Sequence, residues 1–430
     1  MATDKNVFTN NNFRLVFFGA LVSELGVSLY CFAVGFYILD ISGNNAFLQG
    51  LYLSLTAVSL LLLTPLGGVL GDRFNKAKIM SYCDFIKGGL IVAGTLLMMI
   101  FRSSTAQIVN LFIVGIVGNA VSGIFWPSSN GLLPHIVEEG RLQQANAYFS
   151  VKSALLNILG AVTAGVLYNA ISVYLLFFIV GGCYVFSGVS ELFIRYEHAK
   201  PANKLTVKTA FYDMRDGFVY LKGQKPLMTL MAAILFINFF FAPLSGNFLP
   251  YFVKTDIASA QSYLFDSFIS PELWSGVISM TIGISALIGA VILSISKQRE
   301  KCGRSTAVQL CILSAVMILL TVCYYLFVES GDMLNVFLIT LCTCGLAVGS
   351  IISGINIPIN TVIMRTVDKD KLSKVNSITS VLSQGMTPVA SMLAGVVLQY
   401  WGSTPLLAIC SAGFTFAALF VTFSKQTKKI

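Results

Sequence analysis

Charged residues stand inside several long apolar runs of this 430-residue chain. Glu24 and Lys152 each lie within such a run, and Asp84 and Lys87 share a third. A charge in the hydrocarbon core of a bilayer costs roughly 2.5–3.5 kcal/mol on insertion scales. A charged residue at such a position is therefore expected to pair, to titrate or to recognise a polar ligand.

Glu24 is the first candidate for proton exchange or cation recognition. It lies ~11 residues into the apolar segment 13–39, which at ~1.5 Å per residue places it ~16 Å deep, close to the bilayer midplane. Ser28 continues the same helical face at i+4. Lys152, in the segment 144–170, is expected to pair with Glu24 in one conformation and to release it in another. A carboxylate tied to a neighbouring helix is the structural alternative.

Asp84 and Lys87 are spaced i, i+3 on one predicted helix, so that their charges can neutralise each other. We expect this couple to be a structural pair that supports the neighbouring loop rather than a binding site.

The elements that position these residues are predicted to be transmembrane helices. The chain is 56% hydrophobic and 11% charged, whereas soluble domains carry about 25% charged residues. The backbone polar groups of apolar runs of ~20 residues must be satisfied internally in lipid, which favours helices. The first run is too long for a cleavable signal peptide. We predict an all-α membrane protein with twelve transmembrane helices, at 13–39, 46–70, 77–101, 106–132, 144–170, 173–195, 227–254, 272–296, 305–328, 333–363, 375–400 and 404–424.

The distribution of charge orients these helices. All of the 28 Lys and Arg residues fall on the side of the N-terminus or within a helix, except Arg102 and Lys254. Positive residues accumulate on the cytoplasmic side of membrane proteins, so both termini are predicted to be cytoplasmic. The net charge of +9 then faces the anionic inner leaflet of the lipid bilayer, and no nucleic-acid partner is predicted.

An internal repeat divides the chain into two halves. The polar stretch 196–226 separates residues 1–195 from residues 227–430, with six predicted helices in each half. The segment beginning at Pro127 resembles the segment beginning at Pro358, and Arg141 of the first corresponds to Lys371 of the second. We therefore expect two pseudo-symmetric six-helix bundles joined by a cytoplasmic linker. In transporters, such halves rock about a site near the midplane.

The loop between the second and third helices carries the family resemblance. Its residues Gly68, Asp72, Arg73 and Lys76 resemble the pattern G-x-x-x-D-R-x-G-R-R/K of the major facilitator superfamily. In a gating loop of this kind, Gly68 is expected to allow close helix approach, and Asp72 to accept hydrogen bonds from a neighbouring helix N-terminus. Asn75 replaces the family's usual Gly, and we expect it to keep a left-handed backbone.

A second motif is similar to one branch of this family. The segment 213–227, DMRDGFVYLKGQKPL, resembles the entry to helix 7 in macrolide-efflux and enterobactin-exporter-like facilitators. The ends of the fourth and tenth helices, at Pro127 and Pro358, are also similar to lysophospholipid transporters. The fourth helix lacks the Arg, and the fifth the Gly-Pro, that proton-coupled drug exporters of the family often carry.

Polar and aromatic side chains within the helices are candidates for a substrate cavity. Amides can bind a polar ligand or a partner helix, and aromatic rings suit a large amphipathic ligand. Asn356 and Asn360 share one face of a helix that we expect Pro358 to interrupt. Besides Ser28, the cavity candidates are Tyr30, Asn119, Trp126, Asn238, Asn247, Asn356, Asn360 and Gln384.

The motifs of enzymes and metal sites are missing from the sequence. It contains no GxGxxG and no GxxxxGK[ST], which argues against nucleotide hydrolysis. Its nine cysteines form no CxxC and it has two histidines, so neither a metal nor a cofactor is predicted.

The resemblance implies a secondary active transporter, a monomer in the plasma membrane of a bacterium. It would export an amphipathic drug or metabolite by alternating access, as an antiporter driven by the proton gradient. One alternative is a lysophospholipid-like flippase, or a narrow-substrate metabolite carrier, without proton coupling. Another is a transport-inactive sensor or scaffold, which the intact loop disfavours.

Overall fold

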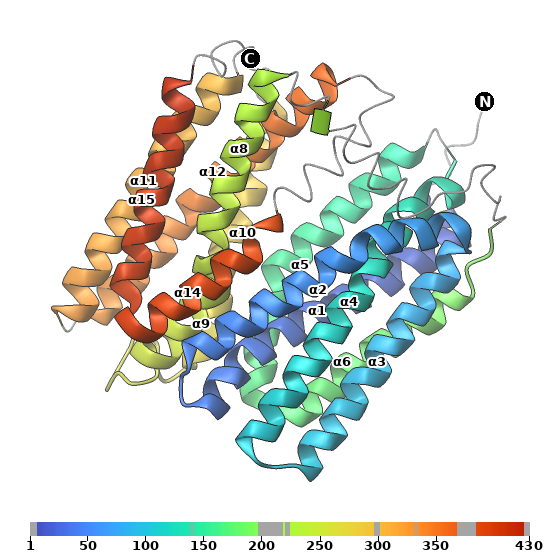
Figure 1. Ribbon diagram of the computed structural model, residues 1–430, viewed down its shortest axis with the longest axis horizontal. Coiled ribbons are helices and arrows are strands. Elements are labelled where there is room, and N and C mark those ends of the chain that lie inside the picture. Colours follow the sequence, from blue (N-terminus) through green and yellow to red (C-terminus); the bar gives the residue numbers. More distant parts are fainter. Residues whose placement is uncertain are drawn as a thin grey trace. The chain divides into compact units, whose positions relative to one another are not determined.

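The computed structural model describes residues 7–138, 141–196, 218–219, 224–295, 302–331, 333–367 and 384–424. Figure 1 shows that long helices dominate this part of the chain. Their bounds are α1 (Asn11–Ser42), α2 (Ala46–Arg73), α3 (Lys76–Ile100), α4 (Ser104–Ile136), α5 (Leu142–Ala170), α6 (Val173–Leu192), α8 (Lys225–Pro243), α9 (Leu249–Phe252), α10 (Pro271–Ile295), α11 (Cys302–Tyr324), α12 (Leu334–Thr366), α14 (Thr387–Trp401) and α15 (Ser403–Phe423).

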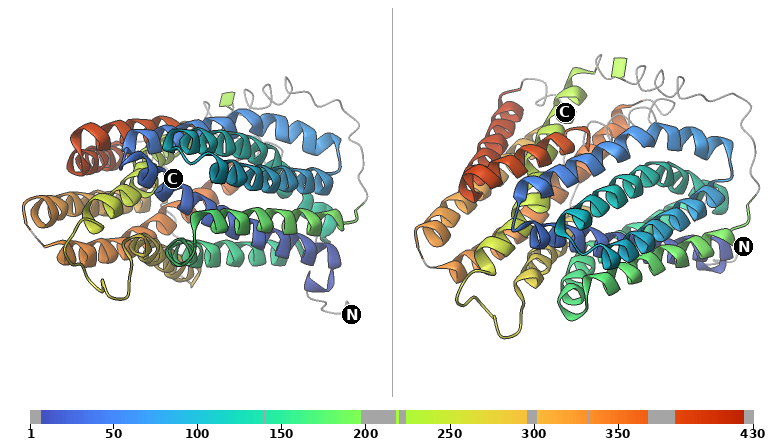
Figure 2. Two further views of the ribbon diagram at one scale, coloured as in Figure 1. Left: turned by 90° about the horizontal axis from the view of Figure 1, so that it is seen from below. Right: turned by 60° about the horizontal axis from the view of Figure 1, so that its bottom comes forward.

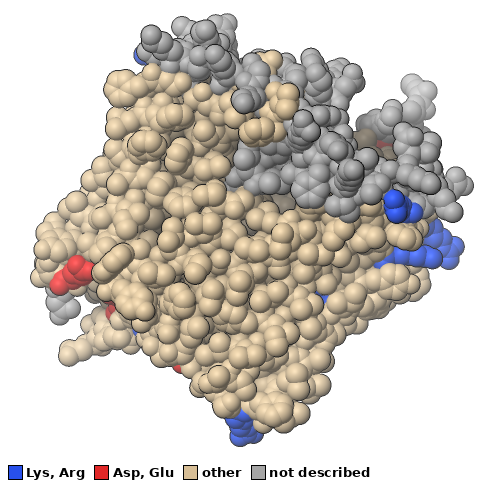
Figure 3. Space-filling view, in the orientation of Figure 1, with Lys and Arg blue, Asp and Glu red and all other residues tan. Residues whose placement is uncertain are grey.

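Within these ranges, eleven helical segments are long and apolar enough to cross a membrane, which confirms the prediction of an all-α, multi-pass membrane protein. The face seen in Figure 3 consists mainly of residues other than Lys, Arg, Asp and Glu. Of the predicted segment 375–400, only the part from residue 384 is described, and α14 runs from Thr387 to Trp401. The count of twelve and the orientation of the termini stay predictions.

Short polar residues start several of these helices. Ser103 caps α4 and Ser172 caps α6, and each hydroxyl accepts a hydrogen bond from a backbone N–H of the first turn. Asn75 caps α3 in the same way, with its side chain accepting from the N–H of Lys78. These caps satisfy backbone donors that have no partner within the helix. The first turns of α3, α4 and α6 are therefore stabilised by these caps.

The chain folds into two compact units. Unit 1 comprises residues 1–37 and 55–211, and unit 2 comprises residues 38–54 and 212–430. The end of α1 and the beginning of α2 thus belong to unit 2. The predicted linker 196–226 lies largely outside the described residues, so the division at that segment stays a prediction.

In unit 1, α3 packs against both α4 and α6, and Figures 1 and 2 show α3 and α6 side by side. Small residues bring their backbones together: Ser81 Oγ donates to the carbonyl of Gly188 over 2.6 Å. A Cβ added to Gly88 would lie 3.0 Å from the carbonyl oxygen of Gly181. This close contact fixes the relative positions of residues on facing turns of α3 and α6.

The close approach expected at Gly68 occurs at its neighbour instead. A Cβ at Gly68 would meet nothing within 4 Å, whereas a Cβ at Gly67 would lie 2.4 Å from the carbonyl oxygen of Gly123 on α4. The prediction for Gly68 was therefore wrong. The face of α2 that contacts α4 is one residue away from it along the helix, and a one-residue step turns a helix by ~100°.

In unit 2, the predicted helix 227–254 is interrupted twice. The regular helix α8 ends at Pro243 and is followed by a π-helical turn, Leu244–Phe248. Helix α9 then leads into a second π-helical turn, Val253–Ile257. Proline removes a backbone N–H and disturbs the preceding turn, and π-helical turns often accompany functional sites. By contrast, α12 runs through Pro358, so the interruption expected there is absent.

Candidate functional site

Glu24 and Lys152 form an ion pair in unit 1. Lys152 Nζ on α5 lies 2.6 Å from Glu24 Oε1 on α1. The lysine side chain is 1% exposed and the glutamate side chain 24% exposed. Lys152 Nζ also lies 4.6 Å from the centre of the Phe149 ring, within the range of a cation–π interaction. The ammonium group is thus enclosed, while the carboxylate remains partly accessible.

A close contact between α1 and α5 supports this pair. Ser28 Oγ donates to the carbonyl of Glu24, one turn earlier on α1. A Cβ added to Gly160 on α5 would lie 2.9 Å from that hydroxyl. The absence of a side chain at Gly160 therefore lets the two helices approach beside the ion pair. Chemically, a carboxylate next to an ammonium group can accept a proton or a cationic ligand in exchange for its lysine partner.

The structure records contacts or exposure of their own for several of the other cavity candidates. Asn119 and Asn238 each donate to the backbone carbonyl four residues earlier in their own helix. The Tyr30 ring lies 5.6 Å from the Phe177 ring. Three candidates, Trp126, Asn356 and Gln384, are exposed, and the side chain of Asn360 lies outside the described residues.

Asn247 is fully buried in unit 2, inside the first π-helical turn. Its side-chain amide donates to the carbonyl of Ser391 over 3.1 Å. This hydrogen bond ties the π-helical turn to α14, which gives Asn247 a structural partner within its own unit.

The loop between α2 and α3 is held from both sides by Lys76. Lys76 Nζ donates to the carbonyl of Gly71, and its backbone N–H donates to the Tyr196 hydroxyl, each over 2.7 Å. Burial raises the pKa of Tyr196 above its usual value. Arg73 is exposed at the end of α2, and the side chain of Asp72 lies outside the described residues.

The left-handed backbone expected at Asn75 is not present. Its φ of −62° and ψ of 113° are extended, because Asn75 is the N-cap of α3. An N-cap requires an extended backbone and a short polar side chain, and asparagine meets both requirements.

Asp84 and Lys87 form the expected pair on α3, with Nζ and Oδ1 3.6 Å apart. A third ionisable residue, Glu191 on α6, is buried in the same region and was not selected from the sequence. Its position near the end of an apolar run resembles that of an interfacial residue. Glu191 is recognised as buried only once α3 and α6 are known to pack against each other in antiparallel orientation. The order of residues in the sequence does not reveal this packing.

A second charged cluster lies in unit 2. Lys254 Nζ, in the second π-helical turn, lies 2.6 Å from Asp40 Oδ1 and 2.7 Å from Glu272 Oε1. Nearby on the same turn, Asp256 accepts a hydrogen bond from the Tyr324 hydroxyl. Lys254 therefore links the end of α1 to the beginning of α10. In the sequence, Lys254 stood out only as one of two basic residues outside the cytoplasmic side, and its ion pairs were not predicted.

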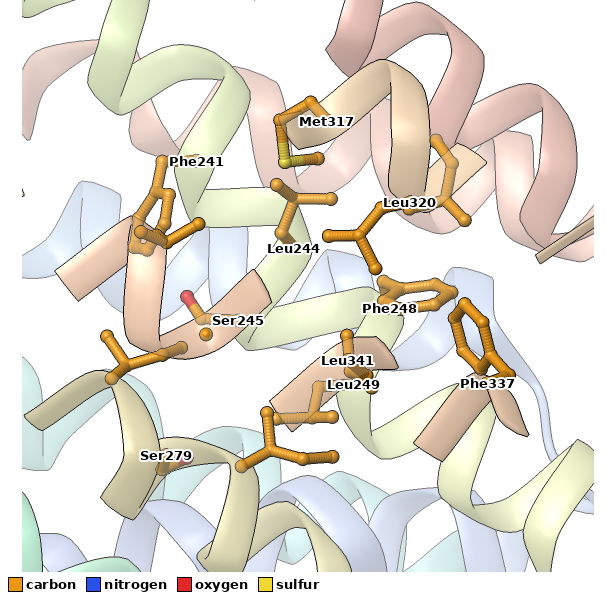
Figure 4. A pocket seen from close by; sticks show the side chains of 15 residues that line it. Phe241, Leu244, Ser245, Phe248, Leu249, Ser279, Met317, Leu320, Phe337 and Leu341 are labelled. Atoms are coloured by element: carbon orange, nitrogen blue, oxygen red, sulfur yellow. The ribbon is translucent and has the colours of Figure 1, made fainter. Parts of the chain in front are cut away.

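An apolar pocket opens beside the first π-helical turn of unit 2 (Figure 4). It contains about 690 Å³ of empty space, part of which is open to the surroundings. Phe248 and Phe337 lie at one end, and Ser245 and Ser279 supply hydroxyl groups elsewhere in the lining. No charged residue belongs to the lining, which consists of Phe241, Leu244, Ser245, Phe248, Leu249, Ile278, Ser279, Ile282, Met317, Leu320, Phe337, Leu341, Gly345, Val348 and Leu407.

These features are those of a helical membrane transporter, and comparison with known proteins identifies the family. The model of the Major Facilitator Superfamily matches residues 16–390, so the chain belongs to that superfamily.

Bacterial members of the family are among its relatives. An uncharacterized MFS-type transporter of Bacillus subtilis, YkuC, is 26% identical over 308 residues, covering 69% of this chain and 67% of the relative. The multi-drug resistance efflux pump PmrA of Streptococcus pneumoniae is 22% identical over 414 residues, covering 95% of each chain.

Solved structures share the fold. A bacterial homologue of the iron transporter ferroportin, in its inward-facing state, has a TM-score of 0.75 at 15% identity and covers 98% of this chain and 100% of its own. The nucleoside transporter NupG has a TM-score of 0.76 at 11% identity and covers 96% of this chain and 100% of its own. The chain therefore has the major facilitator fold and is a small-molecule transporter.

Proposed function

We propose that this protein is a proton-coupled exporter of an amphipathic organic compound, a drug or a secreted metabolite, in a bacterial plasma membrane. Membership of the superfamily establishes transport, and the substrate class and the coupling are the proposal. The observation that carries the substrate class is the apolar pocket of unit 2. The similarity to a multidrug efflux pump over nearly the whole chain supports export as its direction.

The pocket fits the apolar part of such a compound. Ligand sites are typically concave, mostly apolar and equipped with a few polar groups. The rings of Phe248 and Phe337 offer aromatic surface, and Ser245 and Ser279 offer hydrogen bonds. A strongly charged, hydrophilic substrate would lose its hydration there without compensation.

Proton coupling is assigned to Glu24 and Lys152. In this proposal, Glu24 releases Lys152 when it accepts a proton and pairs with it again when the proton leaves. The enclosed ammonium group of Lys152 then changes its partner with each cycle, which links protonation to the contact between α1 and α5. The missing Arg of helix 4 does not affect this route.

The Lys254 cluster supplies a reversible contact for alternating access. Within unit 2, Lys254 links the end of α1 to α10, and Ala46 donates its backbone N–H to Gln399 Oε1 on α14 over 2.8 Å. Residues 38–54 come from the first half of the sequence, whereas α10 and α14 come from the second. We propose that these polar contacts break and reform during transport.

The proposal is tested by efflux from pump-deficient bacterial cells. A fluorescent lipophilic cation and a labelled macrolide are loaded, and their exit is followed with and without a protonophore. We expect efflux by the wild-type protein to be abolished by the protonophore and by Glu24→Gln. The matched control is Glu138→Gln, which neutralises a carboxylate whose side chain is 78% exposed and which should leave efflux unchanged.

A lipid flippase is the second candidate, because an uncharged apolar pocket also fits an acyl chain. In that case, neither test compound leaves the cells. A fluorescent lysophospholipid would instead cross the membrane of vesicles that contain the purified protein, with or without a protonophore. This outcome would contradict the exporter proposal while leaving the pocket as the binding site.

A further inference from the structure

Three ionisable residues are buried together between α3 and α6 of unit 1, apart from the Glu24–Lys152 pair. Asp84 and Lys87 belong to α3, and Glu191 belongs to α6. Their exposures are 0%, 5% and 1%, respectively. Ser81 Oγ of α3 donates to the carbonyl of Gly188 of α6 over 2.6 Å, and Asp84 and Glu191 each lie about one helical turn further along their own helix from this contact. We call these three residues the α3–α6 cluster.

Two aromatic rings lie close to the lysine of the cluster. Lys87 Nζ lies 4.6 Å from the centre of the Phe125 ring and 4.9 Å from the centre of the Tyr184 ring. Aromatic faces attract an ammonium group and do not attract the neutral amine in the same way. Lys87 Nζ thus has Asp84 Oδ1 at 3.6 Å as well as these two rings as neighbours.

The carboxyl groups of the cluster are poorly satisfied. Both oxygens of Asp84 and both oxygens of Glu191 are buried without a hydrogen-bond partner of ordinary geometry within the described part of the chain. The hydroxyl of Ser187, one helical turn before Glu191, is likewise buried without one. Buried polar groups are nearly always hydrogen-bonded. Two ionised carboxylates would leave this region with more negative charge than Lys87 can compensate.

Within the described part of the chain, the groups recorded around Glu191 other than Lys87 carry no positive charge. From α3, Cys83 faces it together with Asp84 and Lys87. From α6 itself, the neighbouring groups are Ser187 and Tyr184, and α4 contributes the Phe125 ring. The groups of α1 that face Tyr184 are Tyr30 and Cys31. With Lys87 charged, one bound proton makes the cluster neutral.

The position of Glu191 in its helix identifies the carboxyl that holds this proton. Glu191 is the second-last residue of α6. The C-terminal end of a helix carries partial negative charge, which disfavours a carboxylate there. Asp84 lies in the interior of α3 and has Lys87 beside it. The ionised carboxylate is thus assigned to Asp84, and the protonated one to Glu191.

We propose that the α3–α6 cluster is a second proton-binding site, in which Glu191 carries one proton at neutral pH. The proton forms an O–H bond with a Glu191 carboxylate oxygen and leaves again as a proton, with no other reactant. This site is independent of the proposed coupling by Glu24, so that either can fail without the other.

Infrared spectroscopy of the purified, full-length protein in lipid tests the proposal. A protonated carboxyl group has a carbonyl stretch that is distinct from the bands of a carboxylate. We expect such a band at neutral pH, a shift of this band when the protein carries isotope-labelled glutamate, and its loss in Glu191→Gln. The band should persist in Glu24→Gln and in Glu138→Gln.

A second variant keeps the test decisive if Glu191→Gln does not fold. In Asp84→Asn, Lys87 has Glu191 as its only carboxylate partner in the cluster, so Glu191 should ionise and the same band should disappear. A band that survives both substitutions, or that does not shift with labelled glutamate, would overturn the assignment. The absence of any protonated-carboxyl band from the wild-type protein at neutral pH would overturn it as well.

Discussion

Lys152 Nζ and Glu24 Oε1 lie 2.6 Å apart although 128 positions separate the two residues in sequence. The pair joins α1 to α5 inside two segments of membrane-spanning length. Such a contact is maintained only while both charges are present, because a buried charge that loses its partner keeps its full desolvation cost.

Removing one member of this pair should therefore destabilise the protein more than removing both. We expect Glu24→Gln to lower the free energy of unfolding by about 1–3 kcal/mol, because it leaves Lys152 enclosed without a carboxylate. The double variant Glu24→Gln/Lys152→Met should recover most of this loss. Thermal unfolding in detergent of the two single variants and the double variant gives the coupling free energy. Additive losses would show that the two side chains do not depend on each other.

Two neighbouring glycines of α2 should respond in opposite directions to alanine. Gly67→Ala places a methyl group against the backbone of Gly123 and should cost about 1–3 kcal/mol. Gly68→Ala meets open space and should be neutral or gain up to ~1 kcal/mol from improved helix propensity. The comparison needs only the unfolding midpoints of the two variants. Equal effects would mean that α2 and α4 do not pack through Gly67.

Lys254→Gln should loosen the attachment of residues 38–54 within unit 2. Without its cation, the carboxylates of Asp40 and Glu272 are close to each other with no positive charge between them, which favours their separation. In a cysteine-free background, Ala46→Cys and Gln399→Cys report this contact through their rate of disulfide formation. The rate should fall in Lys254→Gln and be largely retained in Lys254→Arg. An unchanged rate in Lys254→Gln would remove the cluster from the transport proposal.

Filling the pocket should weaken substrate binding without unfolding the protein. Ser279→Phe adds a ring to the lining and should lower the affinity for a fluorescent lipophilic cation by tenfold or more, ~1.4 kcal/mol. Binding to the purified protein is measured by fluorescence titration. Ile339→Phe places the same ring at an exposed position of α12 and serves as the control. Equal affinity in both variants would exclude this pocket as the substrate site.

The sequence predicted the helices well because each one is a long apolar run ended by polar residues. The first run was predicted at 13–39 and forms α1 over Asn11–Ser42. Glu24 and Lys152 were selected for a simple reason, namely that a charge in such a run is conspicuous. The sequence also predicted that the two residues pair in one conformation, and the structure contains this pair. The enclosure of Lys152 required the fold, since no periodicity relates one helix to a helix four segments later.

The errors arose where a side chain's direction decides its role. The sequence does not show which of the neighbouring residues Gly67 and Gly68 lies in a helix contact. Only the packing of α2 on α4 shows that it is Gly67. The amides of Asn119 and Asn238 each donate to a carbonyl of their own helix, and their place in a substrate cavity stays a prediction. Glu191 escaped selection because its depth depends on how α6 pairs with α3. These properties are tertiary and cannot be read from composition or spacing.

The two π-helical turns of unit 2 allow the rotation of the residues that follow them to change. A π-helical turn closes its hydrogen bond over one residue more than an α-helical turn. Conversion of Leu244–Phe248 to α-helical geometry would rotate every later residue of the segment by ~100° about the helix axis. Lys254 lies after that turn, so the rotation would withdraw its ammonium group from Asp40 and Glu272. The same rotation of this helical segment would therefore change both the shape of the pocket and the contacts of Lys254.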